Sequence, residues 1–116
     1  MFTFSGKVIK GEGRGKKIGT PTANLDNISL PLNYGIYLVE VDFDNNIYTG
    51  LLHFGPKKTF NMNISTEVYI HNFKADIYGR KLKLKVLKKI RKIIKFKNVN
   101  KLIQQIEKDK EELSSV

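Results

Sequence analysis

The fold is decided by Ile36-Tyr-Leu-Val-Glu-Val-Asp-Phe43, followed by Asp44-Asn45-Asn46 and then by Ile47-Tyr-Thr-Gly-Leu-Leu-His-Phe54. Both flanking segments are rich in β-branched and aromatic residues, which are typical of strands. Asn and Asp tolerate the left-handed backbone that a tight hairpin turn requires. The stretch therefore predicts an antiparallel hairpin, and the rest of the chain is interpreted around it.

Further strands are expected on both sides of this hairpin. In Arg80-Lys-Leu-Lys-Leu-Lys-Val-Leu87 apolar and basic residues alternate, which places one set inward and the lysines in water. Strands are also expected over Phe2–Ile9, in a short extended piece from Pro21 to Leu25, and from Glu67 to Phe73. We interpret residues 11–19 as a loop and residues 55–66 as a less regular stretch.

The C-terminus changes to a helical period. Val99, Leu102, Ile103, Ile106 and Leu113 mostly follow i, i+3, i+4, i+7 spacing. This pattern predicts one amphipathic helix that packs against the sheet. About six short strands and one terminal helix favour a mainly β fold, a closed or nearly closed antiparallel barrel, because closure removes exposed strand edges.

Size and composition narrow the class of protein. The 116 residues are expected to form a single domain, 1–116, and they contain no cysteine, which fits a reducing cytoplasm. The sequence contains no run of about 18 apolar residues, so no membrane-spanning helix is predicted. The net charge of +10 is concentrated from Arg80 to Lys101, where there are eleven Lys or Arg residues and no acid. The alternation in Arg80–Leu87 favours a solvated strand face for much of this charge over a nucleic-acid surface.

The strongest functional signal is a glycine-rich loop directly before a polar tetrapeptide. Gly11-Glu-Gly-Arg-Gly-Lys-Lys-Ile-Gly19 offers open backbone N–H groups and two ammonium groups, which suit a polyphosphate. In Pro21-Thr-Ala-Asn24, Thr22 and Asn24 point to one face if the segment is extended. A hydroxyl and a carboxamide oxygen are ligands that suit Mg²⁺. The two segments together predict a nucleotide–metal site and phosphoryl transfer.

Glu67 is the candidate general base, because transfer to an alcohol needs a group that accepts the hydroxyl proton. Asp76 is the rival, but Asp76-Ile-Tyr-Gly79 has the pattern of a turn, in which Asp has a structural role. His53 and His71 show no metal-ligand spacing, and neither is assigned a catalytic role. Nothing indicates a nucleophilic triad.

Three residues near the end of the strand pattern are candidates for contact with flat or charged ligands. Tyr78 beside the turn could touch a nucleobase, and Phe96 could stack on a ring, although core packing is the commoner role of Phe. Arg91 could hold a phosphate or the edge of a polar heterocycle with its planar guanidinium.

The order of these motifs resembles the riboflavin kinase family along essentially the whole chain. The specific part is Gly11-x-Gly13-Arg14-Gly15 followed by Ile18-Gly19-x-Pro21-Thr22-Ala23-Asn24-Leu25. The resemblance continues through Glu67-Val-Tyr-Ile70, Asp76-Ile-Tyr-Gly79 and Ile90-Arg91, and ends with Phe96, Leu102, Gln105-Ile106 and Asp109.

The resemblance implies a six-stranded antiparallel Greek-key barrel with a C-terminal helix. It also implies transfer of the γ-phosphoryl of ATP to the terminal ribityl hydroxyl of riboflavin, which gives FMN and ADP. By this similarity Glu67 would be the catalytic base and Thr22 and Asn24 would meet Mg²⁺ and the phosphates. Gly11, Lys17, Ile70, Asn72 and Tyr78 would contact the nucleotide, and Arg91 and Phe96 would border the flavin. The expected partners are small molecules, and the protein is expected to be a monomer in the cytoplasm.

The sequence also departs from the family pattern and leaves alternatives open. Ile93 and Ile94 stand where an acidic residue and a polar flavin contact are expected, and Tyr69 stands where many relatives have His. Relatives often carry an N-terminal adenylyltransferase domain, for which these 116 residues have no room; we expect the chain to stop at FMN, unless it is a domain cut from a longer protein. ATP, CTP and GTP remain open as donors, as do the preferred metal and the oligomeric state. Two other classes remain: a flavin-binding protein without turnover, and a basic nucleic-acid-binding barrel.

Overall fold

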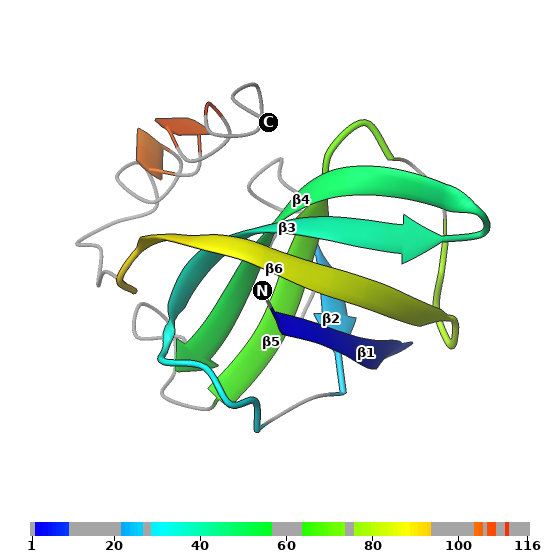
Figure 1. The fold of residues 1–116 in the computed structure, drawn as a ribbon, viewed down its shortest axis with the longest axis horizontal. Helices are drawn as coiled ribbons and strands as arrows, with labels where there is room; N and C mark the ends of the chain where they lie inside the picture. The colour runs from blue at the N-terminus through cyan, green and yellow to red at the C-terminus, as the bar shows by residue number, and fades with distance from the viewer. Residues whose placement is uncertain are drawn as a thin grey trace.

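Six antiparallel strands close into a barrel in the computed structural model of the chain (Figure 1). The structure describes residues 2–9, 22–26, 29–56, 64–73, 76–93, 104–105, 107–108 and 111. The strands are β1 (Phe2–Ile9), β2 (Ala23–Leu25), β3 (Gly35–Phe43), β4 (Asn46–Pro56), β5 (Ile64–Ile70) and β6 (Lys81–Arg91).

The strand order around the barrel is β1-β2-β5-β4-β3-β6, and β6 pairs with β1 to close it. Strands β3, β4 and β5 are consecutive neighbours, and β6 returns to lie beside β3. This spatial order, β6-β3-β4-β5, is that of a Greek key. The predicted mainly β fold and closed six-stranded barrel are confirmed.

The hairpin predicted from residues 36–54 joins β3 to β4. Asp42 pairs with Ile47 and Phe43 with Asn46, which leaves Asp44 and Asn45 as a two-residue turn. Both turn residues have a positive φ, 54° for Asp44 and 65° for Asn45. Two successive left-handed residues are the geometry that matches the twist of a hairpin, and it explains why Asp and Asn occur here.

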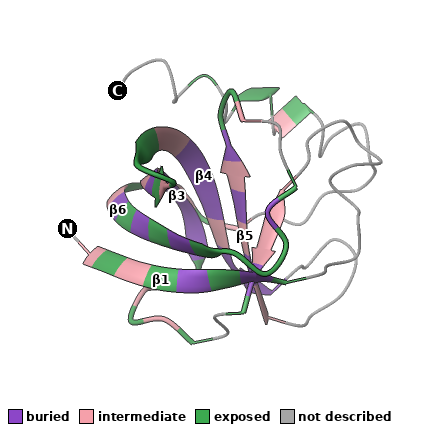
Figure 2. Ribbon diagram, turned by 90° about the vertical axis from the view of Figure 1, so that its right-hand side faces the viewer, coloured by how far each residue is buried: buried purple, intermediate pink, exposed green. Residues whose placement is uncertain are grey.

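Buried and exposed residues alternate along β6 (Figure 2), as expected for a strand with one face toward the barrel interior. In β6, the inward Leu82, Leu84 and Val86 are buried and the intervening Lys81, Lys83 and Lys85 are exposed, as predicted. The interior cluster also includes Val8, Leu25, Tyr37, Val39, Val41, Leu52, Val68, Ile70 and Ile77. Burial of these apolar groups is the main stabilising contribution to the fold.

Tyr37 is the polar exception within this cluster. Its hydroxyl donates a hydrogen bond of 2.6 Å to the carbonyl of Asn33, which satisfies the one polar atom of a buried ring. Burial raises the pKa of the Tyr37 phenol above its ordinary value.

A second apolar cluster lies on the outer face of the barrel. Leu38 and Leu51, which pair across β3 and β4, are buried there, and Tyr69, Leu87 and Ile90 pack against them. Residues 104–105 and 107–108 are helical and lie outside the barrel wall (Figure 1). The apolar stripe predicted for this helix, from Val99 to Leu113, falls on residues outside the described ranges. In the described part of the chain, no helix has the length and apolar character needed to cross a membrane.

Candidate active site

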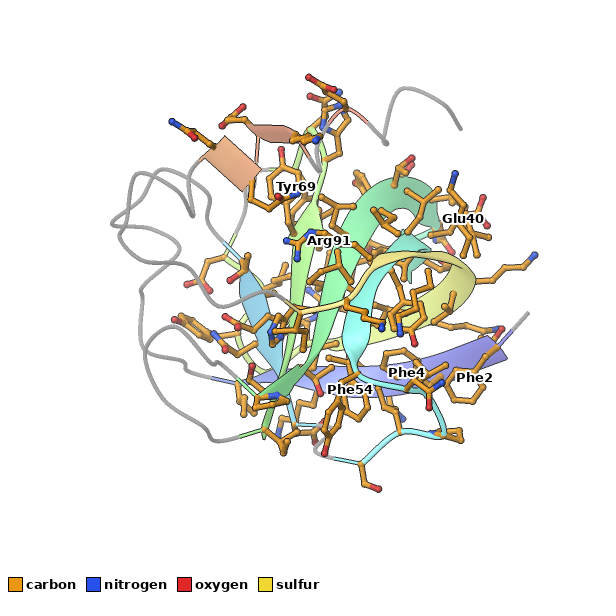
Figure 3. All side chains as sticks on the ribbon, turned by 90° about the vertical axis from the view of Figure 1, so that its left-hand side faces the viewer. Phe2, Phe4, Glu40, Phe54, Tyr69 and Arg91 are labelled. Atoms are coloured by element: carbon orange, nitrogen blue, oxygen red, sulfur yellow. The ribbon has the colours of Figure 1, made fainter. Side chains whose placement is uncertain are left out.

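The predicted site residues of three different strands occupy one row across the outer face of the barrel; Arg91 at its far end is labelled in Figure 3. Asn24 in β2 lies directly opposite Glu67 in β5, and Glu67 lies directly opposite His53 in β4. The row continues from His53 to Ile36 in β3 and from Ile36 to Arg91 in β6. Residues directly opposite each other point to the same face of a sheet. The closed barrel thus gathers side chains that are far apart in the sequence.

Glu67 is held by two hydroxyl groups, one on each carboxylate oxygen. The Thr22 hydroxyl donates to Oε1 at 3.2 Å, and the Ser65 hydroxyl donates to Oε2 at 3.3 Å. These distances are long for hydroxyl hydrogen bonds. The structure therefore brings Thr22 to Glu67, and the strand register brings Asn24 beside it.

The pleat of β5 explains why Glu67 faces outward. Thr66 and Val68, its neighbours in sequence, are 1% and 0% exposed and point into the barrel, so Ser65 and Glu67 must point out. The strand begins at Ile64, before the predicted start, and Glu67 is therefore a mid-strand residue. A backbone paired on both sides, to β2 and to β4, positions its carboxylate more rigidly than a strand end would.

Arg91 reaches the row through two irregularities in the pairing of β6 with β3. Register shifts occur between Ile36 and Tyr37 and between Leu38 and Val39. β-bulges of this kind re-aim the side chains that follow them. The Arg91 guanidinium donates to the carbonyl of Lys92 at 2.9 Å.

The other described candidates are not part of this row. The side chain of Ile70 is buried in the interior cluster, on the face of β5 opposite to Glu67. Asn72 is exposed in the turn after β5, with a φ of 55°. Tyr78 is 61% exposed, and its turn is tied to the end of β1, because the N–H of Gly79 donates to the carbonyl of Val8 at 2.9 Å.

Asp76, the rival base, has the structural role that its turn pattern predicts. Its Oδ1 accepts a hydrogen bond of 3.1 Å from the backbone N–H of Tyr78, which forms an Asx turn. Three further candidates, Gly11, Lys17 and Phe96, lie outside the described residues.

The donor set on the outer face suits a hard cation that is bound mainly through phosphates. Thr22 and Asn24 offer a hydroxyl and a carboxamide oxygen, and Glu67 offers a carboxylate beside them. Mg²⁺ usually takes few protein ligands and keeps substrate phosphates and waters for the rest. Among the described residues, no group of three or more His, Cys, Asp or Glu could hold a metal by itself. These residues therefore fit a metal–nucleotide complex better than a bare metal ion.

Sequence reasoning missed two polar residues of the site, Ser65 and His53. The pattern around Ser65 predicts irregular structure, and the spacing of His53 suggests no role for it. The Ser65 hydroxyl lies 3.4 Å from Nδ1 of His53, in addition to its contact with Glu67. The signal that could have found Ser65 is its i, i+2 spacing from Glu67 on one strand face.

Apolar side chains of Tyr34 and Ile93 lie beside Ser65, over Gly55. Gly55 lies opposite Ser65 and has a φ of 140°. A Cβ added there would collide with the side chain of Ile93 and would lie 2.9 Å from Cβ of Tyr34. Glycine is needed at this position both for the backbone conformation and for the close approach of Ile93.

Comparison with known proteins places the chain in a family. A family model described as "Flavokinase: Riboflavin kinase" matches residues 1–116. Among similar proteins, the trifunctional protein RibF/MnmA of Mycoplasmoides gallisepticum is 41% identical over 112 residues, which cover 94% of this chain and 17% of that protein. The RNA-binding riboflavin kinase RibR of Bacillus subtilis is 35% identical over 111 residues, covering 94% and 48%. The bifunctional riboflavin kinase/FMN adenylyltransferase of the same organism is 37% identical over 117 residues, covering 96% and 37%. The chain thus spans less than half of the length of each of these relatives.

Solved structures share the architecture. A crystal structure described as a macrolide-efflux protein from Streptococcus pneumoniae matches with a TM-score of 0.86 and 32% identity, over 98% of this chain and 38% of that one. Riboflavin kinase from Trypanosoma brucei matches with a TM-score of 0.64 and 22% identity, over 97% and 77%, which is a likeness of fold. With a family match over its whole length and a barrel that agrees with it, the chain belongs to the flavokinase family of riboflavin kinases.

Proposed function

We propose that the chain is a riboflavin kinase that transfers the γ-phosphoryl of ATP to the terminal ribityl hydroxyl of riboflavin and releases FMN and ADP. The observation that carries the proposal is the arrangement of Glu67, which faces outward with a hydroxyl on each oxygen and Asn24 directly opposite. Membership of the flavokinase family supplies the substrate class.

In this proposal Glu67 accepts the proton of the ribityl hydroxyl as that oxygen attacks the γ-phosphorus, and the bond from the γ-phosphorus to the β–γ bridging oxygen breaks. Phosphoryl transfer needs little covalent chemistry from the protein, so most of the rate comes from positioning and charge neutralisation. Thr22 and Asn24 would hold Mg²⁺ with the nucleotide phosphates, and the metal would neutralise the charge of the transferred group. Arg91, at the other end of the row, would border the flavin.

The remaining candidates take the roles that the family resemblance implies. Gly11 and Lys17 would cradle the phosphates, and Phe96 would border the flavin. Tyr78, exposed beside the end of β1, would contact the nucleotide together with Asn72. Ile70 would contribute only indirectly, because its side chain supports the wall from inside.

The test is direct synthesis of FMN. The protein is incubated with riboflavin, Mg²⁺ and ATP, CTP or GTP, and flavins are separated by chromatography with fluorescence detection. We expect FMN with ATP, and we expect Glu67→Gln to lower kcat by about 10²- to 10⁴-fold with little change in nucleotide affinity. Glu40→Gln, which also neutralises a partly exposed carboxylate on the outer wall, is the matched control and should keep its activity.

The possible results separate the alternatives. Near-normal turnover in Glu67→Gln would remove Glu67 from the base role. Quenching of riboflavin fluorescence without FMN from any nucleotide would indicate a flavin-binding protein without turnover. The absence of both FMN and quenching would refute the flavin assignment altogether.

We also propose that the chain acts in the cytoplasm as a monomer on small molecules, although one relative is named an RNA-binding riboflavin kinase. Three exposed lysines of β6, Lys81, Lys83 and Lys85, alternate with buried aliphatic residues. Two of them, Lys83 and Lys85, lie opposite Asp42 and Glu40. A single-stranded RNA surface would instead interleave exposed aromatic and basic side chains. Binding to RNA with a steep salt dependence would contradict this proposal, and a dimer mass in sedimentation would contradict the monomer.

A further inference from the structure

The proposed function leaves the contact of His53 with Ser65 unused, and this contact links His53 to Glu67 through the Ser65 hydroxyl. Nδ1 of His53 lies 3.4 Å from the Ser65 hydroxyl, which itself lies 3.3 Å from Oε2 of Glu67. Resting on the proposed function, we propose that His53 and Ser65 are positioning residues: they form a hydrogen-bond relay that fixes the carboxylate of Glu67 for proton transfer.

The direction of the relay follows from the number of protons. A serine hydroxyl has one proton to donate. Because Ser65 gives that proton to Glu67, its oxygen can only accept from His53. Nδ1 of His53 must therefore carry a proton, and whenever the imidazole is neutral this selects the Nδ1–H tautomer. A His53 with its proton on Nε2 would instead take the Ser65 proton and break the contact with Glu67.

The register of β4 and β5 builds this relay. His53 lies directly opposite Glu67, and Ser65 lies opposite Gly55, so the three polar side chains project from adjacent positions on one outer face. All three are half-buried. Gly55 has no side chain, and Tyr34 and Ile93 fill the space above it. The relay is thus packed on its Gly55 side by apolar groups.

The role of the relay is to reduce the freedom of Glu67. Thr22 restrains Oε1 and Ser65 restrains Oε2. Together the two hydrogen bonds restrict rotation of the Glu67 carboxylate about its last side-chain bond. His53 in turn fixes the rotor of the Ser65 hydroxyl. If the Glu67 carboxylate is already aligned with the hydroxyl proton, its conformational freedom need not be lost on reaching the transition state. Losing this alignment should therefore lower kcat more than substrate affinity.

The first experiment measures the tautomer and needs no activity. Protein labelled with ¹⁵N is studied by NMR at a pH of about 8.5, two units above the ordinary pKa of histidine. We expect His53 to carry its proton on Nδ1, and we expect Ser65→Ala to abolish that preference. A wild-type His53 protonated on Nε2, or a tautomer that Ser65→Ala leaves unchanged, would overturn the relay.

The second experiment measures kinetics in a double-mutant cycle. Ser65→Ala and His53→Leu should each lower kcat on the order of tenfold, with KM values for ATP and riboflavin nearly unchanged. Because both residues act through Glu67, the double variant should lose no more than Ser65→Ala alone, and in Glu67→Gln the Ser65→Ala change should have no further effect. His53→Asn keeps an N–H donor near the position of Nδ1 and should recover most of kcat.

Controls separate positioning from folding. Thr49→Val removes a hydroxyl from the outer face of β4, away from the relay, and should leave kcat unchanged. Each variant is checked by circular dichroism and thermal melting. Additive losses in the double variant, or losses confined to KM, would overturn the inference. A wild-type chain that makes no FMN refutes the proposed function instead, and the tautomer of His53 then decides the relay.

Discussion

Replacing Gly50 with Ala tests whether close contact between β4 and β5 sets the geometry of the site. A Cβ built at Gly50 would lie 2.5 Å from the carbonyl oxygen of Tyr69 in β5. Carbon and oxygen atoms approach favourably only to about 3.3 Å, so the two strands would have to separate by nearly 1 Å. The nearest atom belongs to the backbone, and no side chain can rotate away to relieve the clash.

The magnitude follows from two opposing effects on stability. Overpacking of this kind costs about 1–3 kcal/mol. Replacing Gly with Ala recovers about 0.4–1 kcal/mol by restricting the unfolded chain. The clash therefore outweighs the entropic gain, and we expect a net loss of about 1–2 kcal/mol. With an unfolding entropy of about 2.1 cal/mol/K per residue, a chain of this length loses about 4 °C in Tm for each kcal/mol, so Gly50→Ala should melt about 4–8 °C lower.

The assay is thermal unfolding followed by circular dichroism, together with FMN synthesis at a temperature where all variants are folded. Gly79→Ala is the comparison, because nothing lies within 4 Å of its Cβ and its φ of 78° makes the cost one of backbone strain alone. We expect Gly50→Ala to lower kcat as well as Tm, because the displaced strand carries Glu67. A Gly50→Ala protein as stable as wild type would refute the reasoning, since it would show that the strands do not need glycine at their contact.

Three further predictions concern the core, alkaline stability and the metal. Leu84→Ala, at a fully buried position, should lower the free energy of unfolding by about 2–5 kcal/mol in urea titrations, whereas Ile47→Ala, at a 63% exposed position, should stay within about 0.5 kcal/mol; equal losses would contradict the assignment of the core. Because the pKa of Tyr37 is raised in the folded state, the folded protein holds the phenolic proton more tightly than the unfolded chain does. The resulting contribution to folding stability is complete below a pH of about 10 and is lost as the pH rises through the folded pKa. Tyr37→Phe should flatten that alkaline decline in pH-dependent melts, at the cost of the hydrogen bond to Asn33, and an unchanged slope would assign the decline to other groups. Asn24→Ala should raise the Mg²⁺ concentration needed for half-maximal FMN synthesis, and an identical metal titration would exclude Asn24 as a ligand.

Local patterns are enough to predict the strands whose periodicity is unbroken. The alternation from Lys81 to Val86 in β6 and the Asp44-Asn45-Asn46 turn signal each depend on nearest neighbours. Both the strand and the hairpin are confirmed, although the turn itself takes only Asp44 and Asn45, because Asn46 already pairs with Phe43. The predicted start of β5 is wrong because Ser65 and Thr66 resemble a polar loop, whereas Thr66 is 1% exposed and faces the interior. Burial of a threonine depends on what packs against it, which a single sequence does not reveal.

The sequence predicts some residues of the candidate site but not the strand pairings that bring them together. Residue type and family resemblance identify Thr22, Asn24 and Glu67, and the structure brings them together. The sequence does not single out His53, because its neighbour depends on the register between β4 and β5, which a sequence pattern does not specify. The position of Arg91 likewise depends on bulges in β6 that interrupt the alternation.

The brevity of β2 has a consequence for how the barrel and its ligand depend on each other. This strand has three residues, and it is the wall segment that joins β1 to β5 and thereby completes the ring. Short pairings open most readily, so the ring is expected to part here first. The same strand presents Asn24, with Thr22 immediately before it. A ligand that binds these two residues therefore also stabilises the pairing of β2 with β1 and β5. Because such a ligand binds only the closed barrel, ligand binding and barrel closure are thermodynamically coupled. Nucleotide should therefore slow amide exchange in β2 more than in the long hairpin of β3 and β4.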